Sequence, residues 1–263
     1  MTAFPASATR FILALLGGSL FCSCSIFRGA ETPTDRSPLA QSKQVILVLT
    51  NSWDETSGEL QTFERPVLGD EWKSVSPRTD IVVGRTGLAW GSGLHGYDLG
   101  DGPVKKEGDG KSPAGVFRIS AVFGYAPADS APRFRMPYVY LDSTMQCVDD
   151  ISSEYYNLLV DSLQVKRPDW KSYENMRLSG EAYKWGALVD HNAMPRRDAG
   201  GSCIFLHIWD GPGSSTSGCT AMDETRFLAM LQWLDATKNP TVVQLPKSAY
   251  RRYAQRWQLP LME

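Results

Sequence analysis

Histidine and cysteine are scarce in this sequence, which has only three His and five Cys among 263 residues. The metal-binding spacings Cys-x-x-Cys and His-Glu-x-x-His do not occur, so no metal site is expected. A phosphate-binding loop is not indicated either, because Gly110-Lys111-Ser112 has Lys105 where that loop needs a glycine. We therefore expect no cofactor.

Charge of one sign is not in excess. The 27 Lys and Arg nearly balance the 29 Asp and Glu, for a net charge of -2, so no broad basic surface is available for nucleic acid. A hydrophobic content of 42% is ordinary for a globular protein. The length fits one large β-rich domain, and we expect a single domain without a nucleic-acid partner.

A long apolar run is also missing. Arg10 precedes eleven uncharged residues, Phe11 to Phe21, which fits the core of a signal peptide; a membrane-spanning helix needs roughly 18 or more apolar residues. Residues 1–24 are therefore predicted to be an export segment. Its end, Leu20-Phe21-Cys22-Ser23-Cys24, resembles a degenerate lipoprotein processing site, in which Cys24 would carry the lipid.

Three fates of this segment remain open: a lipoprotein, simple secretion, or an uncleaved anchor. Each places the domain in the periplasm or outer cell envelope, with membrane contact only through the N-terminal segment or its lipid. Residues 25–44 are rich in Thr, Pro, Ser and Gln and are predicted to be a flexible tether. The folded domain is predicted to span residues 45–247, followed by a C-terminal tail at 248–263.

Short β-branched runs separated by Gly and Pro favour a fold that is mainly β with a few helices. The predicted strands lie at Val45–Leu49, Ile81–Val83, Val116–Ile119, Tyr138–Leu141, Ala187–Val189, Cys203–Ile208 and Val242–Leu245. One amphipathic helix is predicted from Phe227, Met230, Leu231 and Leu234, which follow Asp223 and Glu224. A second helix is predicted at Ser153–Leu163.

Three cysteines remain in the predicted domain: Cys147, Cys203 and Cys219. An odd number leaves at least one free thiol in an oxidising compartment. A pairing of Cys147 with Cys203 would leave Cys219 free, but two buried free cysteines are an equal alternative.

His207 and Cys219 form the strongest candidate site. His207 lies on the strand predicted at Cys203–Ile208, and a Gly, Pro and Ser-rich loop then runs from Asp210 to Ser217-Gly218-Cys219. Gly218 permits a tight turn whose amides could form an oxyanion hole. A following helix and a nearby imidazole would favour the Cys219 thiolate.

Two separate elements resemble the L,D-transpeptidase (YkuD-like) catalytic signature. The first is Gly201-Ser202-Cys203-Ile204-Phe205-Leu206-His207-Ile208-Trp209 followed by Thr216-Ser217-Gly218-Cys219-Thr220-Ala221-Met222. The second is Gly108-Asp109-Gly110-Lys111-Ser112-Pro113-Ala114-Gly115-Val116-Phe117. The resemblance implies a β-sandwich-like catalytic domain, with Cys219 as nucleophile and His207 as base on peptidoglycan stem peptides. Gly218 would supply an oxyanion amide, Ser217 would belong to the catalytic turn, and Thr216 and Trp209 would contact substrate.

The sequence departs from this family at two positions. Many members have His before the Gly-Cys pair and Arg two places after the Cys, where this chain has Ser217 and Ala221. That Arg is implicated in substrate binding, so the substrate contacts here stay open. Together with Gly84-Arg85-Thr86-Gly87-Leu88-Ala89-Trp90-Gly91, the pattern resembles a divergent branch.

Three activities follow from this resemblance. The chain could crosslink or remodel the cell wall as a transpeptidase, act as a carboxypeptidase or amidase through the same thioester, or bind peptidoglycan without catalysis. His191 with Asn192 is an alternative source of the imidazole; otherwise these two residues are expected to line the substrate groove. Cys203 is not expected to partner His207, since four strand residues separate them by about 13 Å.

Overall fold

The computed structural model describes residues 37–96, 100–193 and 195–262. The predicted export segment, Cys24 and most of the predicted tether lie outside the described residues. Within the described part of the chain, none of the helices has the length and apolar character needed to cross a membrane.

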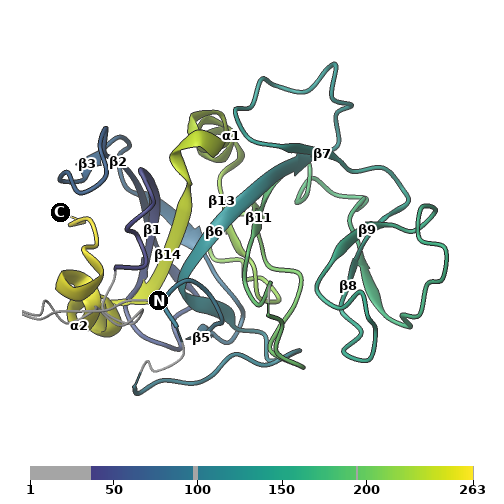
Figure 1. Ribbon diagram of the computed structural model, residues 1–263, viewed down its shortest axis with the longest axis horizontal. Coiled ribbons are helices and arrows are strands. Elements are labelled where there is room, and N and C mark those ends of the chain that lie inside the picture. The colour runs from purple at the N-terminus through teal and green to yellow at the C-terminus, as the bar shows by residue number, and fades with distance from the viewer. Residues whose placement is uncertain (1–36, 97–99, 194, 263) are drawn as a thin grey trace, which may run out of the picture.

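Eight strands pair in the order β1-β14-β6-β11-β12-β13-β4-β2, and a further pairing of β1 with β2 closes this path into a ring (Figure 1). In chain order the ring consists of β1 (Gln44–Thr50), β2 (Ser57–Glu64), β4 (Thr79–Val82), β6 (Ser112–Gly124), β11 (Trp185–Val189), β12 (Phe205–Ile208), β13 (Thr220–Met222) and β14 (Thr241–Pro246). A sheet closed in this way has no edge between its first and last strands.

Short strands extend the ring, and a second, separate sheet lies beside it. The additions are β3 (Lys73–Ser74), β5 (Leu88–Trp90) and β7 (Tyr138–Tyr140), which pair with β2, β6 and β6 respectively. The second sheet, here called the side sheet, has the order β10-β8-β9 and consists of β8 (Met145–Val148), β9 (Leu159–Asp161) and β10 (Tyr173–Asn175). In Figure 1 it lies to the right, apart from β1 and β14.

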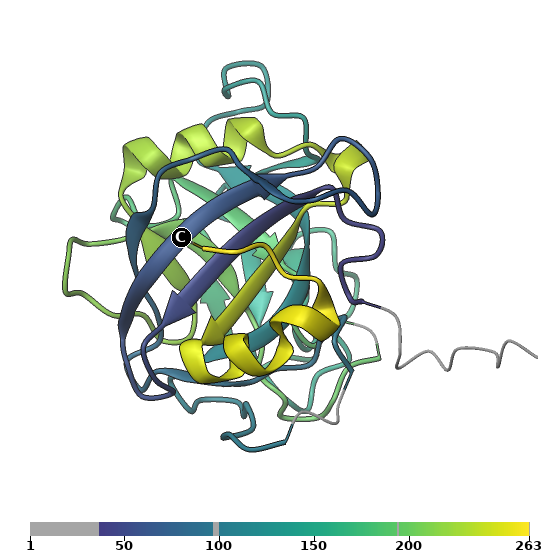
Figure 2. The ribbon, with the colours of Figure 1, turned by 90° about the vertical axis from the view of Figure 1, so that its left-hand side faces the viewer.

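The helices cover the outside of the ring. Helix α1 (Glu224–Trp233) contacts β11 and β12, and α2 (Lys247–Trp257) contacts β14 and β1. Figure 2 shows the two helices on opposite sides of β1, β2 and β14. Every residue of β1 is buried, which explains its continuous apolar run: one face points into the ring and the other is covered. A short 3-10 helix, η2 (Ala236–Lys238), connects α1 to β14.

The predicted β-dominated single domain with few helices is confirmed, as is the helix around Phe227. Helix α1 begins after Asp223, whose carboxylate accepts a hydrogen bond from the Arg226 amide at 3.1 Å, and it buries Phe227, Met230 and Leu231. The acidic N-cap and the i, i+3, i+4 spacing therefore gave the correct helix.

The helix predicted at Ser153–Leu163 is wrong. This segment forms turns and then β9. The Ser153 hydroxyl accepts from the Tyr155 amide at 2.9 Å, and Asn157 has a positive φ of 60°. Both features interrupt helical hydrogen bonding, and the chain then pairs with β8.

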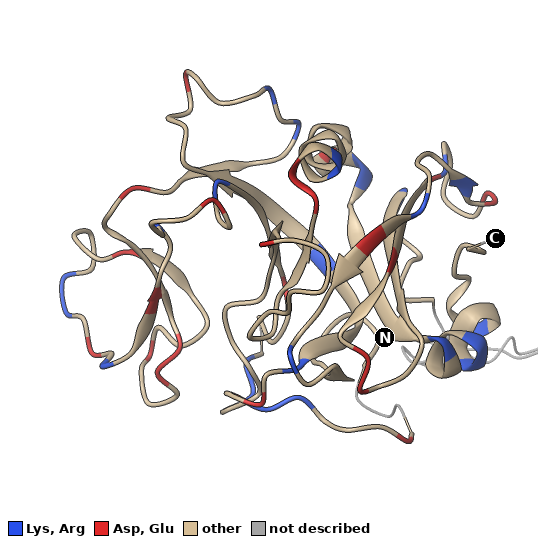
Figure 3. Cartoon of the chain, turned by 180° about the vertical axis from the view of Figure 1, so that it is seen from behind, with Lys and Arg blue, Asp and Glu red and all other residues tan. Residues whose placement is uncertain are grey.

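The ordered domain extends past both ends of the predicted range 45–247. At its start, Leu39 is fully buried, and the buried Arg65 guanidinium donates to the carbonyls of Leu39 and Ser42 at 2.6 and 2.8 Å. At its end, the segment predicted as a tail contains α2, which buries Tyr253 and Trp257. Helix α2 contains Lys247, Arg251, Arg252 and Arg256, seen as blue ribbon in Figure 3. This high content of charged residues hid the spacing of its apolar residues in the sequence.

A disulfide links Cys147 of β8 to Cys203, just before β12. This settles the two alternatives for the cysteines, and Cys219 is a free, buried thiol. All three sulfurs belong to a small second core between the ring and the side sheet, together with Phe123, Leu141, Met176, Tyr183 and Phe205. The disulfide therefore fastens the side sheet to the strand that carries His207.

We predict that the Cys147→Ala/Cys203→Ala double variant loses about 4 kcal/mol of unfolding free energy, because the bond closes a loop across a sequence separation of 56 and restricts the unfolded chain. Urea denaturation of both proteins under oxidising conditions measures this loss. A difference under about 1 kcal/mol would mean that the side sheet is held by packing alone.

Candidate active site

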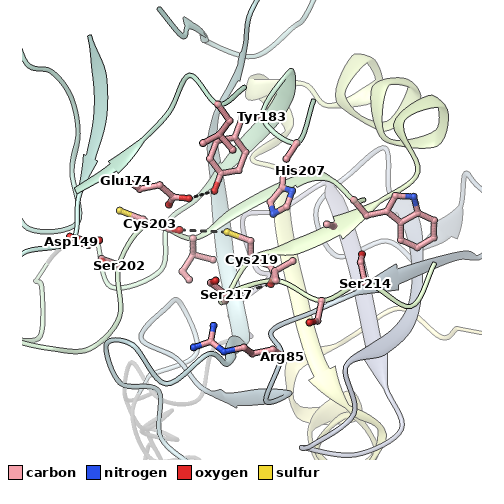
Figure 4. A pocket seen from close by; sticks show the side chains of 18 of the residues that line it. Arg85, Asp149, Glu174, Tyr183, Ser202, Cys203, His207, Ser214, Ser217 and Cys219 are labelled. Atoms are coloured by element: carbon pink, nitrogen blue, oxygen red, sulfur yellow. Dashed lines mark hydrogen bonds between the residues drawn. The ribbon is translucent and has the colours of Figure 1, made fainter. Parts of the chain in front are cut away.

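Cys219 and His207 line the same pocket, which lies between the ring and the side sheet and has a volume of about 550 Å³. Four further predicted site residues line it as well: Trp209, Thr216, Ser217 and Gly218. Figure 4 shows the side chains of Cys219 and His207 lying next to each other on one wall. Among the described residues, no group of three His, Cys, Asp or Glu side chains is arranged to hold a metal ion.

Parallel pairing of β12 with β13 brings the two side chains together. Leu206 is opposite Thr220 and His207 is opposite Ala221, so Cys219 lies beside Phe205, one step before the first pair. The Phe205 amide donates to the Cys219 sulfur at 3.3 Å. Since neighbouring parallel strands present alternate residues to the same face, the thiol and the imidazole share one side of the sheet.

Two hydroxyl groups fix the turn that carries Cys219. The Thr216 and Ser112 hydroxyls both donate to the Cys219 carbonyl at 2.6 Å. The Gly218 amide, expected to be free as an oxyanion donor, instead donates to Thr216 Oγ1 at 3.2 Å. The turn is therefore closed on itself, and Gly218 has no free donor in this state.

The environment of Cys219 favours the thiol. Its residue is only 7% exposed, and its Sγ donates to the Cys203 carbonyl at 3.6 Å. Burial raises the pKa of the thiol well above its usual value, and the negative charge of Glu174 raises it further. The amide of Phe205 is the largest opposing influence. The expectation that the helix and imidazole would favour the thiolate is therefore wrong for this state.

His207 is held as a neutral imidazole. Its Nδ1 lies 2.8 Å from the Ile208 carbonyl, which assigns the proton to Nδ1 and leaves Nε2 as the basic nitrogen. Burial lowers the pKa of His207, although this hydrogen bond opposes the shift. Within the described residues no hydrogen bond joins His207 to Cys219, so the resting pair is thiol and imidazole, not an ion pair.

Tyr183, Glu174 and Asp149 also line the pocket, and sequence reasoning missed all three. The Tyr183 ring packs edge-on against His207, with centroids 5.2 Å apart, and its hydroxyl donates to Glu174 (Figure 4). Asp149 has one buried carboxylate oxygen without a hydrogen-bond partner in the described chain. Glu174 lies on β10 and Asp149 directly follows β8, and no sequence spacing relates these elements to Cys219.

His191 and Asn192 do not line the pocket, which corrects their predicted role. His191 is 1% exposed; its Nδ1 accepts from the Ser92 amide and its Nε2 lies 3.1 Å from the Gly200 carbonyl. The Asn192 amide bonds the backbone of Arg197 and Gly201. Both side chains are fully used in holding the loop before β12, so neither is available to substrate or to Cys219.

The Glu174→Gln variant is expected to alkylate faster at Cys219. Glutamine keeps an acceptor for the Tyr183 hydroxyl but removes the charge that raises the thiol pKa, so more thiolate forms at a given pH. Iodoacetamide kinetics at pH 8, with the adduct mapped by mass spectrometry, should show a several-fold gain. Glu154→Gln, an exposed carboxylate of the same region, is the matched control; an unchanged Glu174→Gln rate would contradict the electrostatic assignment.

Buried His191 should make the fold acid-sensitive. Burial lowers its pKa to about 3, so between pH 6.5 and 3 the unfolded chain binds a proton that the folded chain excludes. Stability is then lost as pH falls, with a slope of about 1.4 kcal/mol per pH unit from this group. Urea unfolding at several pH values should give a shallower slope for His191→Gln between pH 6 and 4. Equal slopes would contradict the prediction.

The comparison with curated proteins gave no match. Among solved structures, Bd1075 of Bdellovibrio bacteriovorus is similar, with 14% identity and a TM-score of 0.36. That match covers 86% of this chain and 57% of the other, so this chain spans less than two thirds of that protein.

A family profile described as the L,D-transpeptidase catalytic domain, YkuD, matches residues 71–243. The matched range includes most of the ring, the side sheet, His207 and Cys219. The chain therefore belongs to the YkuD family of L,D-transpeptidase catalytic domains.

Proposed function

We propose that this protein is a cysteine acyltransferase that acts on peptidoglycan stem peptides through a thioester at Cys219, in cell-wall crosslinking or remodelling. The family to which it belongs acts on such peptides in general. The observation that carries the proposal is the free Cys219 thiol on the pocket wall beside His207. Thr216, Ser217 and Trp209 line the same pocket and are proposed substrate contacts.

The first step is proton transfer from Cys219 to His207. The thiol turns from the Cys203 carbonyl toward Nε2, since Nδ1 is engaged by the Ile208 carbonyl. The sulfur then attacks the peptide carbonyl that links an L-centre to a D-centre residue. As that C–N bond breaks, the imidazolium returns its proton to the leaving amine, and a C–S thioester remains.

Resolution of the thioester determines the activity. An acceptor amine that attacks it forms a new amide and gives transpeptidation, whereas water gives a carboxylic acid and hydrolysis. In either case the thiolate leaves and recovers a proton through His207. The developing oxyanion is proposed to displace Thr216 Oγ1 from the Gly218 amide, whose hydrogen bond of 3.2 Å is long.

We further propose that the protein is exported. Disulfides persist in oxidising compartments such as the periplasm, and Cys147 is bonded to Cys203. The apolar run at Phe11–Phe21 and the pattern around Cys24 support an export segment with or without lipid. Mass spectrometry of membrane and soluble envelope fractions would separate the lipidated form from the secreted form.

Intact-mass spectrometry with a disaccharide-tetrapeptide and an added D-amino acid tests the proposed chemistry. We expect an acyl adduct on the unmodified chain and none on Cys219→Ala, because only the thiol can form the thioester. Exchange of the terminal residue would establish transpeptidation, and release without exchange would establish a carboxypeptidase. Carbapenem serves as a second acylating probe. If neither the peptide nor carbapenem gave an adduct, the proposal of an enzyme would be contradicted, and a peptidoglycan-binding module would remain as the alternative.

A further inference from the structure

Arg85 occupies the opposite side of the pocket from His207 and takes no part in the chemistry described above. It follows β4 in the turn before β5 and lines the pocket together with Cys219. In Figure 4 its guanidinium lies on the far side of Ser217 from the imidazole. The pocket therefore has a cationic side chain near its nucleophile.

Hydrogen bonds attach the Arg85 backbone to the turn that carries Cys219. The Arg85 amide donates to the Thr216 carbonyl at 2.8 Å, and Gly84 forms a β-bridge with Thr216. The Gly84 amide also donates to the Ser112 hydroxyl, which itself donates to the Cys219 carbonyl. The backbone of Arg85 is therefore joined to the Cys219 turn in two ways: directly through Thr216, and through Gly84 and the Ser112 hydroxyl.

Gly110 leaves room for the Arg85 side chain. A Cβ atom built on Gly110 would lie 3.0 Å from Arg85 Cζ and 3.2 Å from its Cγ and Nε. Gly110 also has a φ of 69°, which L side chains rarely adopt. The guanidinium and its aliphatic stem therefore lie over the bare backbone of Gly110, at the exposed rim of the pocket.

No carboxylate neutralises Arg85 within the described residues. The other pocket cation, Lys105, pairs with Asp109 at 2.6 Å. Two pocket acids have donors of their own: Glu107 accepts from Tyr156 and Ser202, and Glu174 accepts from Tyr183. A third pocket acid, Asp149, has one buried oxygen without a partner but forms no ion pair with Arg85. An exposed guanidinium that lines the pocket and has no ion pair among the described residues is suited to an anionic group of the ligand.

We infer that Arg85 forms a carboxylate subsite and binds the C-terminal carboxylate of the residue that leaves when Cys219 attacks. This inference rests on the proposed function. In the proposed substrate the terminal carboxylate belongs to the D-residue just beyond the scissile bond. Because the Arg85 backbone is bonded to the turn that carries Cys219, a carboxylate held by its guanidinium would place that bond, and no bond further inside the stem, at the sulfur.

Calorimetric titration of the full chain carrying Cys219→Ala tests this subsite without catalysis. The probes are a disaccharide-tetrapeptide with a free C-terminal carboxylate and the same peptide as its C-terminal amide. We expect the acid to bind about tenfold more tightly than the amide, as a charge-assisted pair implies. When Arg85→Gln is combined with Cys219→Ala, the preference for the acid should be lost. Arg85→Lys in the same background should retain part of it.

Arg133→Gln, an exposed arginine in the loop between β6 and β7, is the matched control and should leave the preference intact. A thermal unfolding curve of Arg85→Gln that overlays its parent shows that the fold is kept. Equal binding of acid and amide by the parent, a preference that survives Arg85→Gln, or no binding of either peptide would overturn the inference.

These outcomes are separable from failure of the proposed function. If the unmodified chain forms no acyl adduct but the preference for the acid depends on Arg85, the carboxylate subsite is supported and the proposed enzymatic activity is contradicted. If the adduct forms but the preference for the acid does not depend on Arg85, the proposed enzymatic activity is supported and another group binds the carboxylate.

Discussion

Parallel pairing between β12 and β13 is the constraint on which the site depends. The two strands are joined by a loop with no helix in it, and their register places Leu206 opposite Thr220. That register sets the Cys219 sulfur against the Phe205 amide and turns His207 toward the same pocket. A slip of one residue would send either side chain to the opposite face of the sheet. The hydroxyls of Ser112 and Thr216 both donate to the Cys219 carbonyl and so help to fix the position of Cys219 at the start of β13.

A second consequence is that Cys219, the proposed nucleophile, rests in its unreactive thiol form. Burial and the Glu174 carboxylate raise the pKa of Cys219, while burial lowers the pKa of His207, so both groups are neutral at pH 7. The proposed reaction then requires that His207 take the proton from Cys219 before the sulfur attacks. The side sheet supplies Glu174 and is attached by the disulfide at Cys203, so a distant part of the chain sets the resting state of the sulfur.

Local sequence predicted those helices and strands whose pattern of residues lies within a single element. The β-branched runs gave most ring strands, and the spacing around Phe227 gave α1 because a helix periodicity is readable within ten residues. The sequence also predicted that His207 and the Gly218-Cys219 turn share one site, and both line the pocket. This was readable because the two lie on adjoining segments of the chain. The helix predicted at residues 153–163 was wrong because side-chain hydrogen bonds form turns in this segment.

What could not be predicted comes from contacts between segments far apart in sequence. Glu174 comes near Cys219 because the side sheet folds against the ring, Tyr183 comes from the turn before β11, and neither has a motif of its own. His191 was a reasonable alternative base from its type, but its two ring nitrogens are bonded to Ser92 and Gly200. Arg85 resembled part of a family pattern, yet its nearness to the nucleophile follows from the bridge between Gly84 and Thr216.

The central claim is that His207 takes the proton from Cys219. Single-turnover acylation by the stem tetrapeptide, compared between the unmodified chain and His207→Gln, measures it most directly. The account predicts that the variant acylates about 10²- to 10⁴-fold more slowly, as loss of a general base implies, while still being alkylated at Cys219 by iodoacetamide at high pH. An acylation rate for His207→Gln within a few-fold of the unmodified chain would contradict the claim.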